Sequence, residues 1–116
     1  MLMVALKTVR SLALAFDEAE EHPHFENQSF RIKKKIFATL NAKTNKACLK
    51  LSPIDQSVFS DIDRSIIYPV PNKWGKQGWT LIELKKVRKD VFKDALTTAY
   101  CHVAPKKLAE KYQPNV

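Results

Sequence analysis

The N-terminal segment has the residue spacing of an amphipathic helix. Its apolar side chains recur every three or four residues, at Leu2, Leu6, Val9, Leu12, Ala13 and Phe16. This period places them on one face of a helix. We predict a helix of about four turns, which fades in the acidic run 17–21 and stops at Pro23.

Three short runs rich in β-branched and aromatic residues follow, which is the composition of strands. These runs are Ser29–Ile32, Lys35–Leu40 and Ala47–Leu51. Lysines separate the first two runs, and the polar turn Asn41–Lys46 separates the second from the third. Connections this short are typical of an antiparallel meander.

A helix start follows the third predicted strand. Ser52 can cap the helix, Pro53 fits the first helical position, and Asp55 stands where the capping carboxylate belongs. The apolar side chains behind this start fall on one face of the predicted helix, at Ile54, Val58, Phe59 and Ile62.

The C-terminal half predicts two more strands and two helices. Residues 66–71 are extended, and their two prolines confine them to a sheet edge or to no strand. Residues 77–84 predict a stronger strand, and we expect a hairpin-like connection between the two. Apolar residues from Val91 to Ala99 predict a helix, and a short one starts at Pro105.

The predicted elements run in the order helix, three strands, helix, two strands and two helices. This order is typical of an α+β fold in which helices pack against an antiparallel sheet. A length of 116 residues with 45% hydrophobic content fits one domain over residues 1–116.

Charge is distributed unevenly along the chain. The net charge is +8, and residues 1–30 hold 2 basic and 5 acidic side chains against 18 and 7 in residues 31–116. A basic body of this kind favours polyanions such as DNA or RNA. The alternative is a well-solvated surface without a polyanionic partner.

The remaining composition excludes several classes of protein. The cysteines, Cys48 and Cys101, form no C-x-x-C pair, so we expect free thiols in a reducing cytoplasm. The unbroken apolar run 12–16 is too short to span a membrane or to form a signal-peptide core. No nucleotide-binding or nucleophile motif is present, so we expect no catalytic residue and no cofactor.

Four motifs in order resemble the MmcQ/YjbR family over nearly the whole chain. They are F-R-I-K-K-K-I-F-A-T-L, C-L-K-L-S-P-x-x-Q, W-G-x-x-G-W and A-P-K-K. The resemblance implies a fold related to secretion chaperones and similar to bacterial frataxin. Members are described as DNA-binding proteins with hairpin wings as the contact surface, and no catalytic residues are established for them.

The family's motif positions fall on particular residues of this chain. They are Lys35, Phe37, Ser52, Pro53, Gln56, Gly78, Trp79, Lys106 and Lys107. Many members carry glycine at the first hairpin turn, whereas this chain has Lys33-Lys34-Lys35. The difference adds positive charge at the tip.

Basic residues in four segments are the candidate DNA contacts. The first is the hairpin, where cations at the tip can lie along a phosphate backbone. Lysines that protect an exposed turn are the structural alternative. The candidates are Arg31, Lys33, Lys34 and Lys35 in the hairpin, Lys73 and Lys76 beside the tryptophans, Lys85, Lys86 and Arg88 after the last strand, and Lys106 and Lys107.

The two tryptophans have different expected roles. Trp74 lies in the connecting segment, where an exposed indole could stack on a base. Trp79 begins a strand and shares a face with Leu81, opposite Thr80 and Ile82, so we expect it to anchor the fold.

Two further clusters raise the question of metal binding or catalysis. The run 17–24 contains carboxylates and histidines but no strict ligand spacing, so we expect a solvated helix end and no metal. Cys101 and His102 are adjacent on a helix and point in different directions, which disfavours a nucleophile–base pair.

We therefore expect a small cytoplasmic, non-enzymatic protein that binds duplex DNA mainly through phosphates. The alternative is a protein- or peptide-binding module of the secretion-chaperone type, which an exposed apolar patch would favour. An enzyme of unrecognised type is the third hypothesis. No membrane association is expected.

Overall fold

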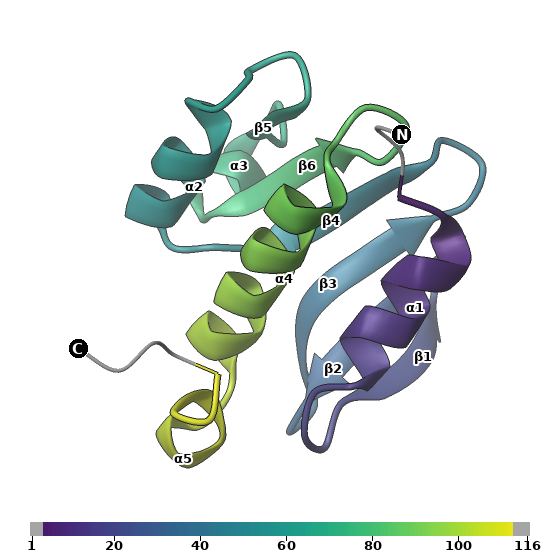
Figure 1. Ribbon diagram of the computed structural model, residues 1–116, viewed down its shortest axis with the longest axis vertical. Coiled ribbons are helices and arrows are strands. Elements are labelled where there is room, and N and C mark those ends of the chain that lie inside the picture. The colour runs from purple at the N-terminus through teal and green to yellow at the C-terminus, as the bar shows by residue number, and fades with distance from the viewer. Residues whose placement is uncertain (1–3, 113–116) are drawn as a thin grey trace.

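The structure, a computed structural model, describes residues 4–112 and contains one six-stranded antiparallel sheet (Figure 1). The strands lie in the order β1-β2-β3-β4-β6-β5. The elements are α1 (Leu6–Leu14), β1 (Glu20–His24), β2 (Asn27–Ile32), β3 (Lys35–Asn41), β4 (Lys46–Lys50), α2 (Pro53–Ser60), β5 (Ile67–Pro69), α3 (Lys73–Lys76), β6 (Trp79–Glu83), α4 (Lys89–Val103) and α5 (Lys106–Ala109). The predicted α+β class is confirmed.

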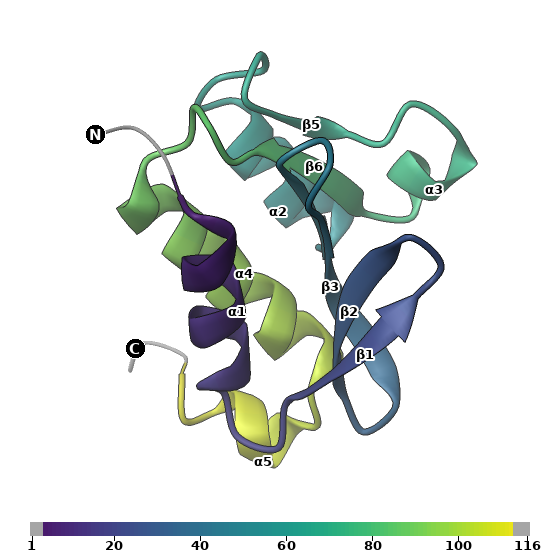
Figure 2. The same ribbon diagram turned by 90° about the vertical axis from the view of Figure 1, so that its right-hand side faces the viewer.

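Helices α1 and α4 cover one face of the sheet, and the opposite face has no helix over its centre (Figure 2). Helix α4 buries Phe92, Leu96 and Tyr100, and α1 buries Val9 and Ala13. Strands β4 and β6 alternate buried with half-buried residues, as expected where only one face is covered. We call the other side the open face.

Strand β1 was not predicted, because its sequence contains no β-branched residue. The predicted helix was also too long: α1 ends at Leu14, and Leu2 lies outside the described residues. The acidic run enters an edge strand in which Glu20 is paired with Arg31. Pro23 does not stop a helix but lies within this strand, where an edge position tolerates its missing N–H.

The three-strand meander and the start of α2 agree with prediction. Ser52 caps α2, since its Oγ accepts a hydrogen bond from the backbone N–H of Asp55 at 3.1 Å. The apolar residues predicted along one face of α2 are mostly exposed. Ile54, Val58 and Ile62 are 76%, 58% and 58% exposed, and Ile62 lies beyond the end of the helix, while Phe59 packs on the core.

The C-terminal elements agree with prediction except between β5 and β6. Strand β5 is an edge strand, as its prolines required. The connection to β6 is not a simple hairpin turn, because it contains the helical turn α3, capped by the Asn72 side chain at Trp74 N. Among residues 4–112, no helix has the length and apolar run needed to cross a membrane.

Candidate functional site

One junction holds α2, α3 and β6 together and thereby positions both tryptophans. The Gln56 side-chain Nε2 lies 2.9 Å from Gly75 O, 3.2 Å from Trp79 O and 3.1 Å from Thr80 Oγ1. The Ser-Pro-x-x-Gln motif thus starts a helix and anchors the segment that carries Trp74.

Both glycines of the chain are required at this junction. Gly78 has φ +103°, and a Cβ there would lie 1.8 Å from the carbonyl oxygen of Leu51. A Cβ on Gly75 would lie 2.0 Å from the carbonyl oxygen of Val70. The Gly-x-x-Gly spacing is therefore explained by close backbone approach and not by a phosphate cradle.

An open groove lies on the open face between the β1–β2 turn and α3, which approach each other in Figure 2. Its volume is about 300 Å³. Among residues 4–112, the lining is predominantly apolar and aromatic and contains no carboxylate; it consists of His24, Asn27, Ile36, Thr39, Cys48, Val70, Trp74 and Trp79. We call this the tryptophan groove.

Each tryptophan of the groove has a lysine over its ring. Trp79 is half-buried on the open face, as its alternation with Thr80 predicted, and Lys50 Nζ lies 5.6 Å from its ring centre. Trp74 is 49% exposed, and Lys73 Nζ lies 5.7 Å from its ring centre. Cations at this distance are attracted to the indole face.

The Cys48 thiol in the groove lacks the surroundings of a nucleophile. Burial raises the pKa of this thiol to about 11. A reactive cysteine has a lowered pKa, because the thiolate is the attacking species. Cys48 therefore lines the tryptophan groove as a packed side chain and does not have the features of a nucleophile.

The β2–β3 hairpin turn carries Lys33 and Lys34, whose φ angles are 51° and 69°. Two left-handed residues in a row form the turn type that favours glycine in hairpins. Lys33 forms an ion pair with Glu18 at 2.6 Å, and Glu18 and Glu20 lie beside Arg31 in one hollow. The acidic segment therefore offsets part of the charge at this tip, whereas Lys34 and Lys35 are exposed.

The remaining predicted contacts lie elsewhere. Trp79 is at one end of β6, and Lys85 and Lys86 follow its other end. Arg88 is paired with Asp90 at 3.0 Å. Lys106 and Lys107 are exposed on α5, which lies on the helical side of the molecule in Figure 2. The fold thus separates the predicted residues into several surfaces.

The acidic run serves the fold through ion pairs. Arg10 bonds Glu21 at 3.1 Å, and His22 contacts Glu20 at 2.9 Å. Within residues 4–112, no group of three His, Cys, Asp or Glu side chains is arranged to hold a metal ion.

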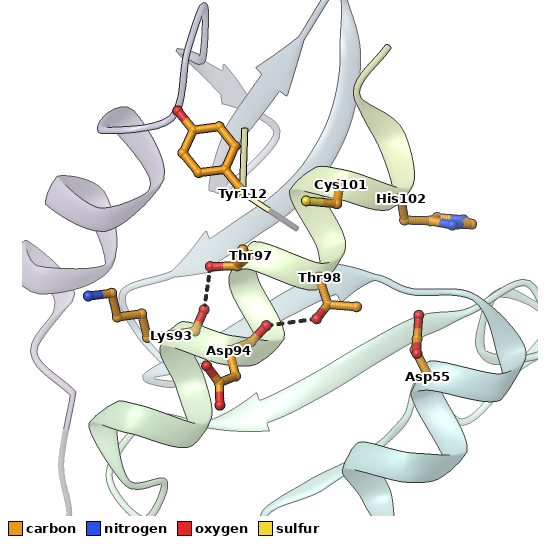
Figure 3. Close-up of a pocket in the computed structure, with 8 residues that line it drawn as sticks. All are labelled: Asp55, Lys93, Asp94, Thr97, Thr98, Cys101, His102 and Tyr112. Atoms are coloured by element: carbon orange, nitrogen blue, oxygen red, sulfur yellow. Dashed lines mark hydrogen bonds between the residues drawn. The ribbon is translucent and has the colours of Figure 1, made fainter. Parts of the chain in front are cut away.

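A larger hollow of about 830 Å³ lies along α4 and has the residue types of an active site (Figure 3). The Thr97 and Thr98 hydroxyls donate to the carbonyls of Lys93 and Asp94 at 2.8 Å each, so their protons are engaged within the helix. Figure 3 shows the Cys101 and His102 side chains pointing in different directions. Burial raises the pKa of the Cys101 thiol. The described residues that line this hollow include no paired nucleophile and base.

Sequence reasoning missed the groove residues contributed by the β1–β2 hairpin and by β4. Phe25, 94% exposed at the turn with φ 58°, stands beside His24 at a ring-centre distance of 4.8 Å. Its isolation between Pro23 and the polar Asn27 was a signal of an exposed aromatic turn. The association of these residues with Lys50 and the tryptophans depends on sheet curvature, which no local pattern reports.

Comparisons with known proteins agree with this architecture. The YjbR family model matches residues 14–102. The crystal structure of Deinococcus radiodurans protein DR2400, with the family-model domain DUF419, superposes with a TM-score of 0.79 at 18% identity, covering 97% of this chain and 90% of that chain. At this identity the likeness shows a shared fold. No curated protein matches the chain.

Proposed function

The chain belongs to the YjbR family, and from that premise we propose that it is a DNA-binding protein that contacts phosphates through lysines. One observation carries the proposal. Lys34, Lys35, Lys73 and Lys76 are exposed, and among residues 4–112 none of them forms an ion pair with a carboxylate. Unpaired surface cations are available to replace the counterions of a phosphate backbone.

The two lysine pairs contribute unequally in this proposal. Glu18 and Glu20 lower the positive potential at the β2–β3 tip. In α3, Lys73 lies over the exposed ring of Trp74, Lys76 is exposed in the same turn, and α3 itself contains no acidic residue. We therefore assign the stronger contact to α3. Binding would be weakly sequence-specific, because phosphate contacts do not read bases.

Charge reversal combined with a salt series tests this proposal. Binding of labelled random duplex DNA should weaken as salt rises, since each neutralised phosphate contributes a slope of about −0.9 in log K against log[salt]. The Lys73→Glu/Lys76→Glu variant should bind at least about 10-fold more weakly, with a slope shallower by about two contacts.

The matched control is Lys106→Glu/Lys107→Glu on α5, which makes the same change of net charge at a distant exposed site. It should lose much less affinity than the α3 variant. Equal losses in the two variants would show that only net charge matters. No binding of the wild-type chain at low salt would refute the proposal.

A second candidate function is protein binding, and an exposed apolar stripe on α2 and the turn after it favours this role. Ile54 and Val58 lie on α2, Ile62 lies in the turn that follows its end, and all three are more than half exposed. Residues 53–64 carry Asp55, Asp61 and Asp63 against one arginine. The complementary partner is an amphipathic helix with basic residues along its edge.

The absence of catalysis and the cytoplasmic location also belong to the proposal. Burial raises the pKa of both thiols, Cys48 and Cys101, which supports a binding role over a nucleophilic one. Both cysteines are free, and free thiols persist in reducing compartments.

A further inference from the structure

The tryptophan groove has the dimensions of a site for one small planar group. Its volume of about 300 Å³ is at the lower end of the usual range for ligand pockets, about 300–1,000 Å³. A groove of this size admits a single ring system and excludes a stacked base pair with its backbone.

Its walls are suited to stacking. Trp74 from α3 and Trp79 from β6 line the groove, and His24 lines it from β1. Phe25 extends from the neighbouring turn with 94% of its surface exposed. Aromatic side chains at a groove bind unpaired bases through their faces, since every base presents a π-face.

The charges around the groove favour a polyanion over a peptide. Lys50 and Lys73 lie over the two indole rings, and no carboxylate from the described part of the chain lines the groove. Glu26, exposed in the β1–β2 turn, is the acidic exception at the rim. A phosphate on either side of a bound base would lie within reach of lysine side chains at α3.

Resting on the proposed DNA binding, we propose that the tryptophan groove holds one unpaired base of a single strand. The base stacks on Trp74 and Trp79, which line the groove. Lysines of α3 and Lys50 hold the flanking phosphates. The protein therefore prefers single-stranded or frayed DNA to an intact duplex.

Intrinsic fluorescence reports on this groove selectively, because both tryptophans of the chain line it. The experiment titrates the full chain with fluorescently labelled oligo-dA, oligo-dT and random duplex DNA. Anisotropy of the label measures binding anywhere on the protein, and tryptophan emission measures occupation of the groove. We expect both single strands to bind more tightly than the duplex and to quench the emission.

Variants of Trp74 test the stacking. Trp74→Ala should weaken oligo-dA binding by about 10-fold, whereas Trp74→Phe retains a ring and should recover most of the lost affinity. Thermal unfolding of each variant establishes that it is folded.

The outcomes distinguish this inference from the proposed function. No anisotropy change with any DNA at low salt refutes both. DNA binding without quenching, or with equal affinity for single strands and duplex, overturns the groove assignment and leaves phosphate binding intact. Quenching by a proline-rich peptide but by no oligonucleotide would instead identify the groove as a peptide site.

Discussion

At the scale of single residues, glycines and one glutamine decide where the tryptophans stand. Gly78 brings β6 against Leu51, whose N–H donates to Gly78 O at 3.0 Å. Gln56 then ties α2 to the carbonyls of Gly75 and Trp79. The two glycines and Gln56 therefore have a structural role: they hold in place the surface on which binding is proposed.

Gly78→Ala should destabilise the protein strongly. The new Cβ would meet Leu51 O at 1.8 Å, and φ +103° is strained for any L side chain. We expect a loss of at least about 3 kcal/mol in the free energy of unfolding. This corresponds to a fall in Tm of more than about 10 °C for a domain of this size.

The neighbouring exposed variant Gln77→Ala is the control, and its free energy of unfolding should stay within about 0.5 kcal/mol of the wild type. Thermal unfolding followed by circular dichroism measures both. A Gly78→Ala protein as stable as the control would contradict the close-approach argument.

At the scale of elements, the local residue pattern did not predict strand β1 or the exposure of the apolar residues of α2. Strand β1 is polar and contains proline, yet it pairs along its length with β2. Helix α2 has a helical apolar period, yet its stripe faces away from the core, since Phe59 and Ser60 provide the buried contacts. Periodicity predicted that this helix exists but not which side of it is covered.

The α2 stripe should bind an amphipathic helix with basic edges, if it is a docking surface. A synthetic leucine–lysine peptide should gain helicity on titration with the wild type. The Ile54→Ser/Val58→Ser variant should bind this peptide about 10-fold more weakly. It should keep its stability, because both side chains are already more than half exposed.

Leu14→Ser, which changes another exposed apolar residue, on α1, is the matched control and should bind the peptide like the wild type. Peptide binding that is equal for wild type and for the α2 double variant would exclude the stripe as the docking surface.

At the scale of the whole molecule, Asp17 joins the segment after α1 to α4 and to the C-terminal turn. Its carbonyl accepts from the Tyr100 hydroxyl at 2.7 Å, and its carboxylate contacts Tyr112 at 3.0 Å and is paired with Lys111. The Tyr100 ring stacks on Phe16 with ring centres 4.5 Å apart. This cluster fixes the helical layer at one end.

Asp17→Asn should make the stability of the protein depend less on pH in the acidic range. Hydrogen bonds from Lys111 and Tyr112 hold the pKa of the Asp17 carboxyl below its ordinary value. Because the pKa is lowered in the folded state, the ionised Asp17 carboxylate stabilises the fold fully above its unfolded pKa of about 3.9. This stabilisation is lost as the pH falls through the lower pKa of the folded state.

The wild type should therefore have the higher Tm at neutral pH, and the difference from Asp17→Asn should narrow below about pH 4. Thermal unfolding between neutral pH and about pH 2 measures this. A difference that stays constant with pH would show that the carboxylate charge plays no part.

Local pattern by itself determined the fold class, the meander, the cap of α2, the edge position of β5 and the sheet face on which Trp79 lies. Alternation and capping are short-range effects that neighbouring residues report directly. Only the tertiary structure decided that Glu18 offsets Lys33, that Lys85 lies apart from Lys73, and that Asn27 faces the same groove as Trp74. These relations depend on sheet order and curvature, which arise from contacts between residues far apart in the chain.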